Sequence, residues 1–264
     1  MKNYDGLVIG SGRELGLVAL GRLYTLHKRG SLKDVKAYSG CSVGSIICFF
    51  LSIGYDPHDI RSIAIDAKLV DIHQLSFTNM LTSMGLQKHE VISKFIELEL
   101  MERYGKIITL KEHFQITGKV LYLCVTNLTK KRREYISYQS HPHISVVKAL
   151  EMSFSIPGLF EKCEWREQIY VDGSVTDPLP VTPLADMKGN ILVLHMHRKI
   201  KNENNNIIQY YNSIYDVIDR TLTLPSLDMC KKDNFTLETI EIDDNTILVT
   251  KEKKMEYYDY GRSL

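Results

Sequence analysis

A serine between two glycines is the residue in this sequence that is best suited to chemistry. Residues 40–44 read Gly-Cys-Ser-Val-Gly, a G-x-S-x-G pattern between the apolar stretches 34–39 and 45–51. We expect a strand before the pattern and a buried helix after it. A turn of this kind exposes the Ser42 hydroxyl above the sheet, and the start of the helix favours negative charge there. The pattern predicts a nucleophilic serine, although it also suits an ordinary glycine-rich turn.

A nucleophilic serine also needs donors for the negative charge that develops on its substrate. Residues 10–16, Gly-Ser-Gly-Arg-Glu-Leu-Gly, follow a first strand-like stretch at residues 6–9. The carboxyl ends of neighbouring parallel strands lie side by side, so the N–H groups of Gly12 and Arg13 can face Ser42. The loop also resembles a dinucleotide site. Such a site usually has an acidic residue at the end of the second strand, where this chain has small residues.

The best candidate for the base is Asp172, in the segment Tyr-Val-Asp-Gly-Ser at residues 170–174. An aspartate between a short strand and a glycine turn is held by its own backbone. The apolar segment Ser-Phe-Ser-Ile-Pro-Gly-Leu-Phe at residues 153–160 can pack beneath it. Asp-Gly is also a common β-turn. To act as a base the carboxyl must be partly shielded, because a well-solvated carboxylate is too weak.

Histidine offers a rival arrangement. Asp172 is followed by His195 and His197, and the order Ser, Asp, His also fits the α/β-hydrolases. In those enzymes several strands precede the nucleophile, whereas here only one precedes the strand that leads to Ser42. The two histidines alternate with Met196 at a strand end, which favours a structural role.

The elements expected around these residues alternate between strand and helix. An amphipathic pattern over residues 17–28 predicts a helix between the first two strands, and this β-α-β-α start favours a parallel sheet covered by helices. Residues 56–114 are expected to be mostly helical. Further strands are expected at 118–126, 134–138, 170–171, 191–196 and twice within 235–249, helices at 146–154 and 207–224, and an exposed tail or helix at 251–264.

Composition sets broad limits. A chain of 264 residues with 44% hydrophobic and 25% charged residues can bury a substantial core, and its net charge of +1 gives no reason to expect nucleic acid. Five cysteines without C-x-x-C spacing argue against a disulfide framework or a zinc ribbon. No apolar run approaches the ~20 residues of a membrane span, and a signal peptide's apolar region is missing at the start. We expect one intracellular, cytoplasmic domain over residues 1–264, without cofactor or metal. The oligomeric state is left open.

The loop, the G-x-S-x-G and the Asp-Gly, in this order and with Ser-Phe-Ser-Ile-Pro before the last, resemble the patatin-like phospholipases. The resemblance covers about residues 4–197 and leaves 198–264 as an extension that completes the domain. It implies a patatin-like α/β fold, a three-layer α/β/α sandwich with a mostly parallel central sheet. It further implies a lipid acyl hydrolase that acts on phospholipid or a related ester through an acyl-enzyme. The implied site residues are the dyad Ser42 and Asp172, the oxyanion donors Gly12, Arg13 and Val43, and the turn glycines Gly40, Gly44 and Gly173.

The loop departs from the family pattern G-G-G-x-[K/R]-G. With Gly16 aligned, Arg13 takes the place of the third glycine and Leu15 the basic position. Arg13 can still donate its N–H if its φ and ψ are allowed, and loss of one oxyanion donor costs ~10²–10³ in turnover. The change to Asp-Gly-Ser at residues 172–174 is milder. The alternative function is therefore a catalytically weak lipid-binding or interaction protein on the same scaffold.

Two further features suit a lipid. Met80, Leu81, Met84 and Leu86 can line an acyl groove or form a cover, although such residues are as often core. Residues 130–133, Lys-Lys-Arg-Arg, can hold the chain against an anionic membrane, at about 1 kcal/mol per charge, or simply form a solvated hairpin tip.

Overall fold

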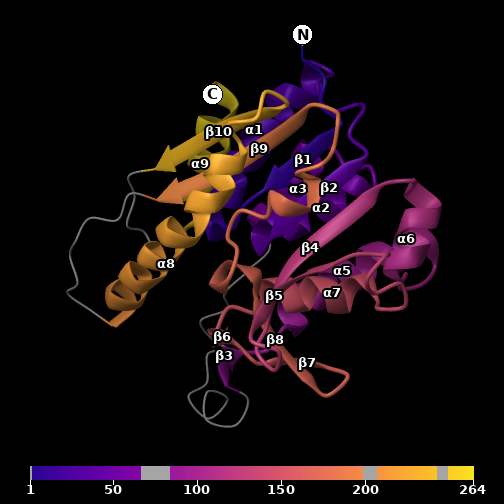
Figure 1. The fold of residues 1–264 in the computed structure, drawn as a ribbon, viewed down its shortest axis with the longest axis vertical. Coiled ribbons are helices and arrows are strands. Elements are labelled where there is room, and N and C mark those ends of the chain that lie inside the picture. Colours follow the sequence, from indigo (N-terminus) through magenta and orange to yellow (C-terminus); the bar gives the residue numbers. More distant parts are fainter. Residues whose placement is uncertain (1, 67–83, 199–206, 243–248) are drawn as a thin grey trace.

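A mostly parallel sheet forms the centre of the computed structural model, which describes residues 2–66, 84–198, 207–242 and 249–264. Its eight strands follow the order β10-β9-β1-β2-β4-β8-β7, with β5 paired to β4 (Figure 1). They are β1 Gly6–Ile9, β2 Ala37–Cys41, β4 Val120–Asn127, β5 Arg132–Ile136, β7 Cys163–Trp165, β8 Gln168–Asp172, β9 Ile191–Arg198 and β10 Phe235–Ile242. The path from β10 to β4 is parallel, and β5, β8 and β7 pair antiparallel. The predicted sheet is thus confirmed.

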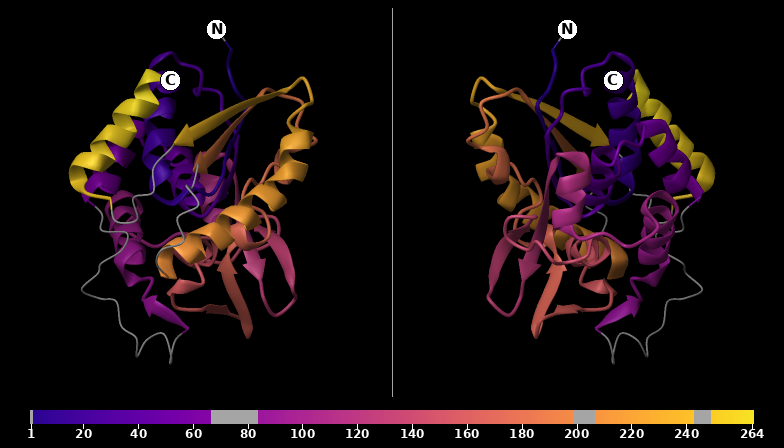
Figure 2. Two further views of the ribbon diagram at one scale, coloured as in Figure 1. Left: turned by 90° about the vertical axis from the view of Figure 1, so that its left-hand side faces the viewer. Right: turned by 90° about the vertical axis from the view of Figure 1, so that its right-hand side faces the viewer.

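Helices cover both faces of the sheet (Figure 2). On one face lie α1 Gly16–Lys28, α2 Val43–Ser52, α3 Pro57–Asp66, α5 Glu90–Tyr104, α6 Leu110–Thr117, α7 Val146–Phe154 and α9 Lys251–Ser263, and on the other lies α8 Ile207–Met229. Successive residues of a strand point to opposite faces. Leu7 and Ile9 of β1 therefore join the core under α1 and α2, while Val8 joins the core under α8. This three-layer arrangement is the predicted one.

Most predicted elements are confirmed, with some shifts at their ends. The strand expected at residues 34–39 ends later, at Cys41, because Gly40 and Cys41 pair with β4. Within 56–114, residues 85–87 form a short strand, β3, that pairs with β6 Gly158–Phe160. Helix α8 runs five residues past its expected end, through Pro225, because residues up to Met229 pack against the sheet. In 235–249 the described residues form one strand, and 243–248 lie outside the described part.

The charged C-terminal segment forms a docked helix rather than an exposed tail. A Cβ atom added to Gly261 would lie 2.0 Å from the Val18 oxygen, and one added to Gly21 would lie 2.1 Å from the Tyr258 oxygen. The backbones of α9 and α1 therefore touch, and Tyr257 and Tyr258 are buried. Strand β10 and helices α8 and α9 all join the layers built by the first part of the chain (Figure 1). None of the described helices combines the length and apolarity needed to cross a bilayer.

Candidate active site

Ser42 occupies a strained turn between β2 and α2. Its φ of 56° and ψ of −124° lie in a region that a residue with a Cβ rarely adopts. The flanking glycines permit the turn: a Cβ on Gly40 would lie 2.5 Å from the Ser45 Cα, and one on Gly44 would lie 2.3 Å from the Ile9 oxygen. The turn is thus pressed against the end of β1, as the predicted parallel pairing requires.

Asp172, at the end of β8, is fully buried. Its Oδ1 accepts a hydrogen bond from the Ser174 N–H at 2.8 Å, whereas its Oδ2 has no hydrogen-bond partner among the described residues. The Thr126 hydroxyl donates to the Asp172 carbonyl at 2.9 Å. A Cβ on Gly173 would lie 2.4 Å from the Cys124 oxygen, so the turn after the aspartate needs a glycine to pack this closely. The carboxyl is thus held in place through Oδ1, while the buried Oδ2 can still accept a hydrogen bond.

The structure brings Ser42 and Asp172 together. Cys41 pairs with Cys124 across β2 and β4, Val125 pairs with Asp172 across β4 and β8, and the Cys41 Sγ lies 4.0 Å from the Asp172 Oδ1. Burial raises the pKa of the Asp172 carboxyl, while the nearby Ser42 hydroxyl and Ser174 lower it in part. The net direction is upward, which makes the carboxylate a stronger base than an aspartate in water.

The segment Ser-Phe-Ser-Ile-Pro at residues 153–157 fixes both of these residues. The Ser153 hydroxyl accepts a hydrogen bond from the Ser42 N–H at 3.3 Å and donates one to the Cys124 carbonyl at 2.7 Å. The Ser155 carbonyl accepts from the Asp172 N–H at 2.9 Å. The sequence predicts only apolar packing for this segment. Its two serines in an apolar stretch were the signal for a polar role, because buried hydroxyls need partners.

The Ser155 hydroxyl is anchored in turn. It donates to the Glu151 carbonyl and lies 2.7 Å from the Nε2 of His89, which is buried and stacked on Phe160. Ser153, Ser155 and His89 are not among the site residues predicted from the sequence.

The expected oxyanion loop lies between β1 and α1. Gly10 donates its N–H to the Leu194 carbonyl at 3.1 Å and Ser11 donates to the Pro178 carbonyl at 2.8 Å, so the loop is tied to the sheet edge. A Cβ on Gly12 would lie 2.9 Å from Met196, and only a glycine fits there without a shift of that side chain.

The donors named from the sequence differ in backbone geometry. The N–H groups of Gly12 and Val43 donate no hydrogen bond within the described part of the chain. Arg13 has a φ of 47°, in the left-handed region that favours glycine. This backbone conformation is one that the glycine of the family pattern adopts easily. In this chain an arginine adopts it instead. Gly16 packs against Val43, where an added Cβ would lie 2.7 Å from Cγ2.

An apolar cavity of about 80 Å³ begins beside this loop. Arg13 and Val43, whose N–H groups are candidate oxyanion donors, line part of it. Side chains of α1, α2, α3 and α5, such as Leu17, Ile47 and Phe50, line the rest. The residues expected to form an acyl groove are not part of this lining: Met84 is exposed, Leu86 lies in β3, and Met80 and Leu81 lie outside the described residues.

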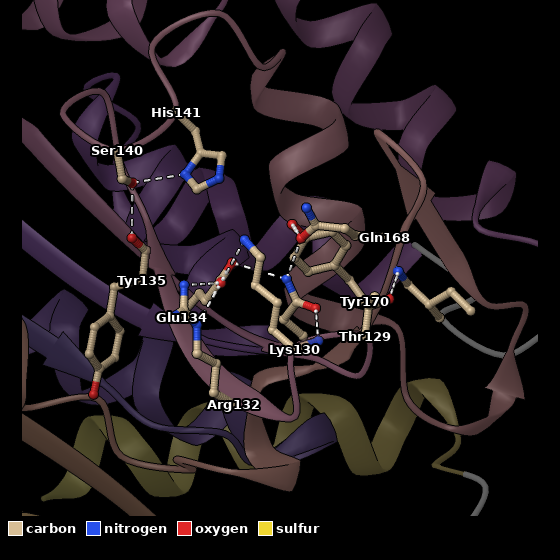
Figure 3. A network of polar contacts seen from close by, with 11 residues as sticks. Thr129, Lys130, Arg132, Glu134, Tyr135, Ser140, His141, Gln168 and Tyr170 are labelled. Atoms are coloured by element: carbon tan, nitrogen blue, oxygen red, sulfur yellow. Dashed lines mark hydrogen bonds and ion pairs between the residues drawn. The ribbon is translucent and has the colours of Figure 1, made fainter.

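The basic residues 130–133 form a turn and the start of β5, and most of their charges are paired. Figure 3 shows Lys130 and Arg132 beside Glu134. Lys130 and Arg132 contact Glu134 at 3.4 and 2.9 Å, and Arg133 lies 3.8 Å from Asp177. Three of the four positive charges thus have acidic partners. Contact of this turn with an anionic membrane stays a prediction.

The two histidines of β9 do not form a triad with Ser42. His195 and His197 lie on the strand face toward α8, and no hydrogen bond links either imidazole to Ser42 or Asp172 within the described residues. The arrangement with a histidine base is therefore not present.

A family model described as patatin-like phospholipase matches residues 7–185 of this chain, which is more than half of its length. The chain therefore belongs to the patatin-like phospholipase family.

Two curated viral proteins are similar to it. The chain is 32% identical over 184 residues to "Probable lipid hydrolase 463L" of Invertebrate iridescent virus 6, a match that covers 68% of this chain and 63% of that protein. It is 27% identical over 189 residues to "Uncharacterized protein R571" of Acanthamoeba polyphaga mimivirus, covering 68% and 61%. The chain thus matches less than two thirds of the length of these relatives.

Among solved structures, VipD from Legionella pneumophila is similar with a TM-score of 0.61 at 17% identity, covering 99% of this chain and 66% of VipD. The type III effector ExoU of Pseudomonas aeruginosa is similar with a TM-score of 0.57 at 14% identity, covering 98% and 51%. At these identities the likeness shows the fold alone.

Proposed function

We propose that this protein is a lipid acyl hydrolase that uses Ser42 and Asp172 as a catalytic dyad. The observation that carries the proposal is the fully buried Asp172 carboxyl, whose Oδ2 has no partner among the described residues, beside a serine on a strained turn. Such an oxygen can accept a proton, and burial raises the pKa of its carboxyl. Family membership supports the same reaction class.

In the first half of the reaction, the Ser42 Oγ attacks an ester carbonyl while Asp172 takes the hydroxyl proton. The N–H groups of Gly12, Arg13 and Val43 stabilise the oxyanion, assisted by the positive end of α2. The bond to the alcohol breaks, and the alcohol leaves with the proton from Asp172. In the second half, water attacks the acyl-serine, Asp172 accepts its proton and returns it to Ser42, and the fatty acid is released.

The apolar cavity next to Arg13 and Val43 supports a substrate with a hydrocarbon chain. An acyl chain that entered it would place its carbonyl carbon beside the Ser42 turn. A polar ester without such a chain would gain nothing from this surface. The name "Probable lipid hydrolase" of a relative agrees with this substrate class.

Hydrolysis assays over phospholipids, lysophospholipids and triglycerides test the proposal. The parent protein should release fatty acid from at least one class, and Ser42→Ala and Asp172→Asn should each abolish the release with the fold retained. Two controls match these changes: Ser52→Ala removes another buried hydroxyl of α2, and Asp177→Asn removes a buried carboxyl five residues from Asp172. Activity near the parent level in Ser42→Ala or Asp172→Asn, or a parent that labels with no activated-serine probe, would refute the dyad.

A further inference from the structure

A cluster of metal-binding side chains lies on the opposite face of the sheet from α1 and α2. His195 and His197 come from β9 and Asp219 from α8, and one ligand atom from each lies within 4.8 Å of the others. Residues two apart on a strand share a face. Val193 of the same strand packs into the core under α8, so both imidazoles point toward that helix.

Hydrogen bonding does not account for this cluster. Both ring nitrogens of His195 are shielded from solvent and have no hydrogen-bond partner in the described part of the chain. A buried polar atom without a partner costs free energy, and in a folded protein it calls for an explanation such as a bound ion. Asp219 is held from the other side, where the Ser11 hydroxyl donates to its Oδ1 at 3.4 Å.

We propose that His195, His197 and Asp219 bind a divalent transition metal ion of the zinc class. Imidazole nitrogen and carboxylate oxygen suit Zn²⁺, and three protein ligands leave a fourth tetrahedral position for water. Bonds of about 2.0–2.1 Å place tetrahedral ligand atoms about 3.3 Å apart. The three ligand atoms, which lie within 4.8 Å of one another, would therefore have to move closer together by roughly 1.5 Å at most to reach this spacing.

The positive charge next to the cluster is also compensated. Arg220, which follows Asp219 on α8, is paired with Asp216 at 2.8 Å.

The site would join three elements. An ion there ties α8 to the carboxyl end of β9, and through Ser11 it also reaches the loop that holds Gly12. Sequence analysis expected no metal on the basis of cysteine spacing, which does not cover a His-x-His pair completed by a distant helix. The proposal replaces that expectation and is independent of the proposed hydrolase activity.

Metal binding to the tag-free, chelator-treated full chain tests this site directly. Zn²⁺ affinity is measured by competition with a chromophoric chelator, geometry by the visible absorption of the Co²⁺ form, and stability by the melting temperature with and without Zn²⁺. The parent protein should bind one Zn²⁺, give the intense spectrum of four-coordinate Co²⁺ and melt at a higher temperature with Zn²⁺.

Matched variants assign the ligands. Asp219→Asn and His197→Gln should weaken Zn²⁺ binding at least tenfold and remove the stabilisation. Asp228→Asn, an exposed carboxyl on the same helix, and His58→Gln on α3 should bind as the parent does. The melting temperature of each variant without metal shows that it is folded. A parent that binds no Zn²⁺, or an Asp219→Asn variant with unchanged affinity, overturns the proposal.

Discussion

To act as the proposed base, Asp172 must remain buried, and burial of a carboxylate opposes folding. An acid whose pKa is higher in the folded than in the unfolded state destabilises the fold at every pH above its unfolded value of about 3.9. The cost grows as the pH rises through the folded pKa and is constant above it. The residue is therefore maintained at the expense of stability.

The variant Asp172→Asn tests whether the buried carboxylate is needed for activity and at the same time lowers stability. The variant should lose ester hydrolysis and yet melt a few degrees higher than the parent at neutral pH, because about 1 kcal/mol corresponds to roughly 2–4 °C in a chain of this size. The difference should shrink as the pH is lowered from the folded pKa of Asp172 toward the unfolded value of about 3.9, because the carboxyl is then protonated in the folded parent as well. Calorimetry across this range measures it. A variant that is less stable than the parent at neutral pH contradicts the account.

The raised pKa of Asp172 also determines how the reaction rate should depend on pH. Only the ionised carboxylate accepts the Ser42 proton, so activity should rise with pH through the folded pKa of Asp172. Since burial raises that pKa, the acid limb of kcat/KM should lie above the range of an aspartate in water. A limb at or below pH 4 with a soluble ester substrate would rule out a buried Asp172 as the base.

The backbone of Arg13 is also strained. Its φ of 47° costs a residue with a Cβ about 1–2 kcal/mol, and a β-branched residue more. Arg13→Gly should keep the melting temperature within a few degrees and retain or raise kcat. Arg13→Val should lower kcat about tenfold or more if it moves the N–H that is proposed to stabilise the oxyanion. Equal kcat values for the two variants would exclude this N–H as a donor.

At the level of elements, the end of α7 positions the site. Ser153 joins the Ser42 turn to β4, and Ser155 joins the end of β8 to the same helix. The parts that carry the proposed nucleophile and the proposed base are thus held by one segment. A small displacement of α7 would change their separation.

The variant Ser153→Ala tests whether Ser153 positions the Ser42 turn or only stabilises the fold. It should lower kcat by about tenfold and destabilise the fold by about 1 kcal/mol, as loss of a buried hydrogen bond does. Ser145→Ala, which removes the N-cap of the same helix, has a similar cost in stability but should leave kcat unchanged. Thermal melts and steady-state kinetics of both variants give the comparison. If the two lose activity equally, Ser153 has only a structural role.

At the level of the whole molecule, the C-terminal helix completes one of the helical layers. Gly261→Ala would push a Cβ into the Val18 carbonyl. We therefore expect the free energy of unfolding to fall by about 1–3 kcal/mol, because the two helices must shift apart. Met255→Ala on the exposed side of α9 should have little effect. Denaturant unfolding measures both. An unchanged stability in Gly261→Ala would mean that α9 does not dock on α1 in this way.

The strand-to-helix repeats at the start of the chain could be predicted because their signals are local. Residues 6–9, 17–28 and 45–51 each have an apolar pattern that fits one element, and parallel pairing of the first two strands then puts the loop at residues 10–16 next to the Ser42 turn. The candidate site followed from three short motifs in a fixed order. Their backbone geometry, including the positive φ of Arg13, required the structure.

Interactions between distant segments could not be predicted in this way. Nothing near residues 251–264 shows that Gly261 will meet Gly21, since the signal is a close contact between two helices. The same holds for Ser153, whose partners are backbone groups of β4 and the Ser42 turn. Likewise, Asp219 joins His195 and His197 only because α8 packs across the carboxyl end of β9.

The most direct measurement is the site of covalent labelling by a fluorophosphonate, mapped by peptide mass spectrometry on the full chain. If Ser42 and Asp172 act as a dyad, the parent protein carries one adduct on Ser42, and Asp172→Asn carries almost none although it is folded. An adduct on another serine, or equal labelling of Ser42 in Asp172→Asn, would contradict the dyad.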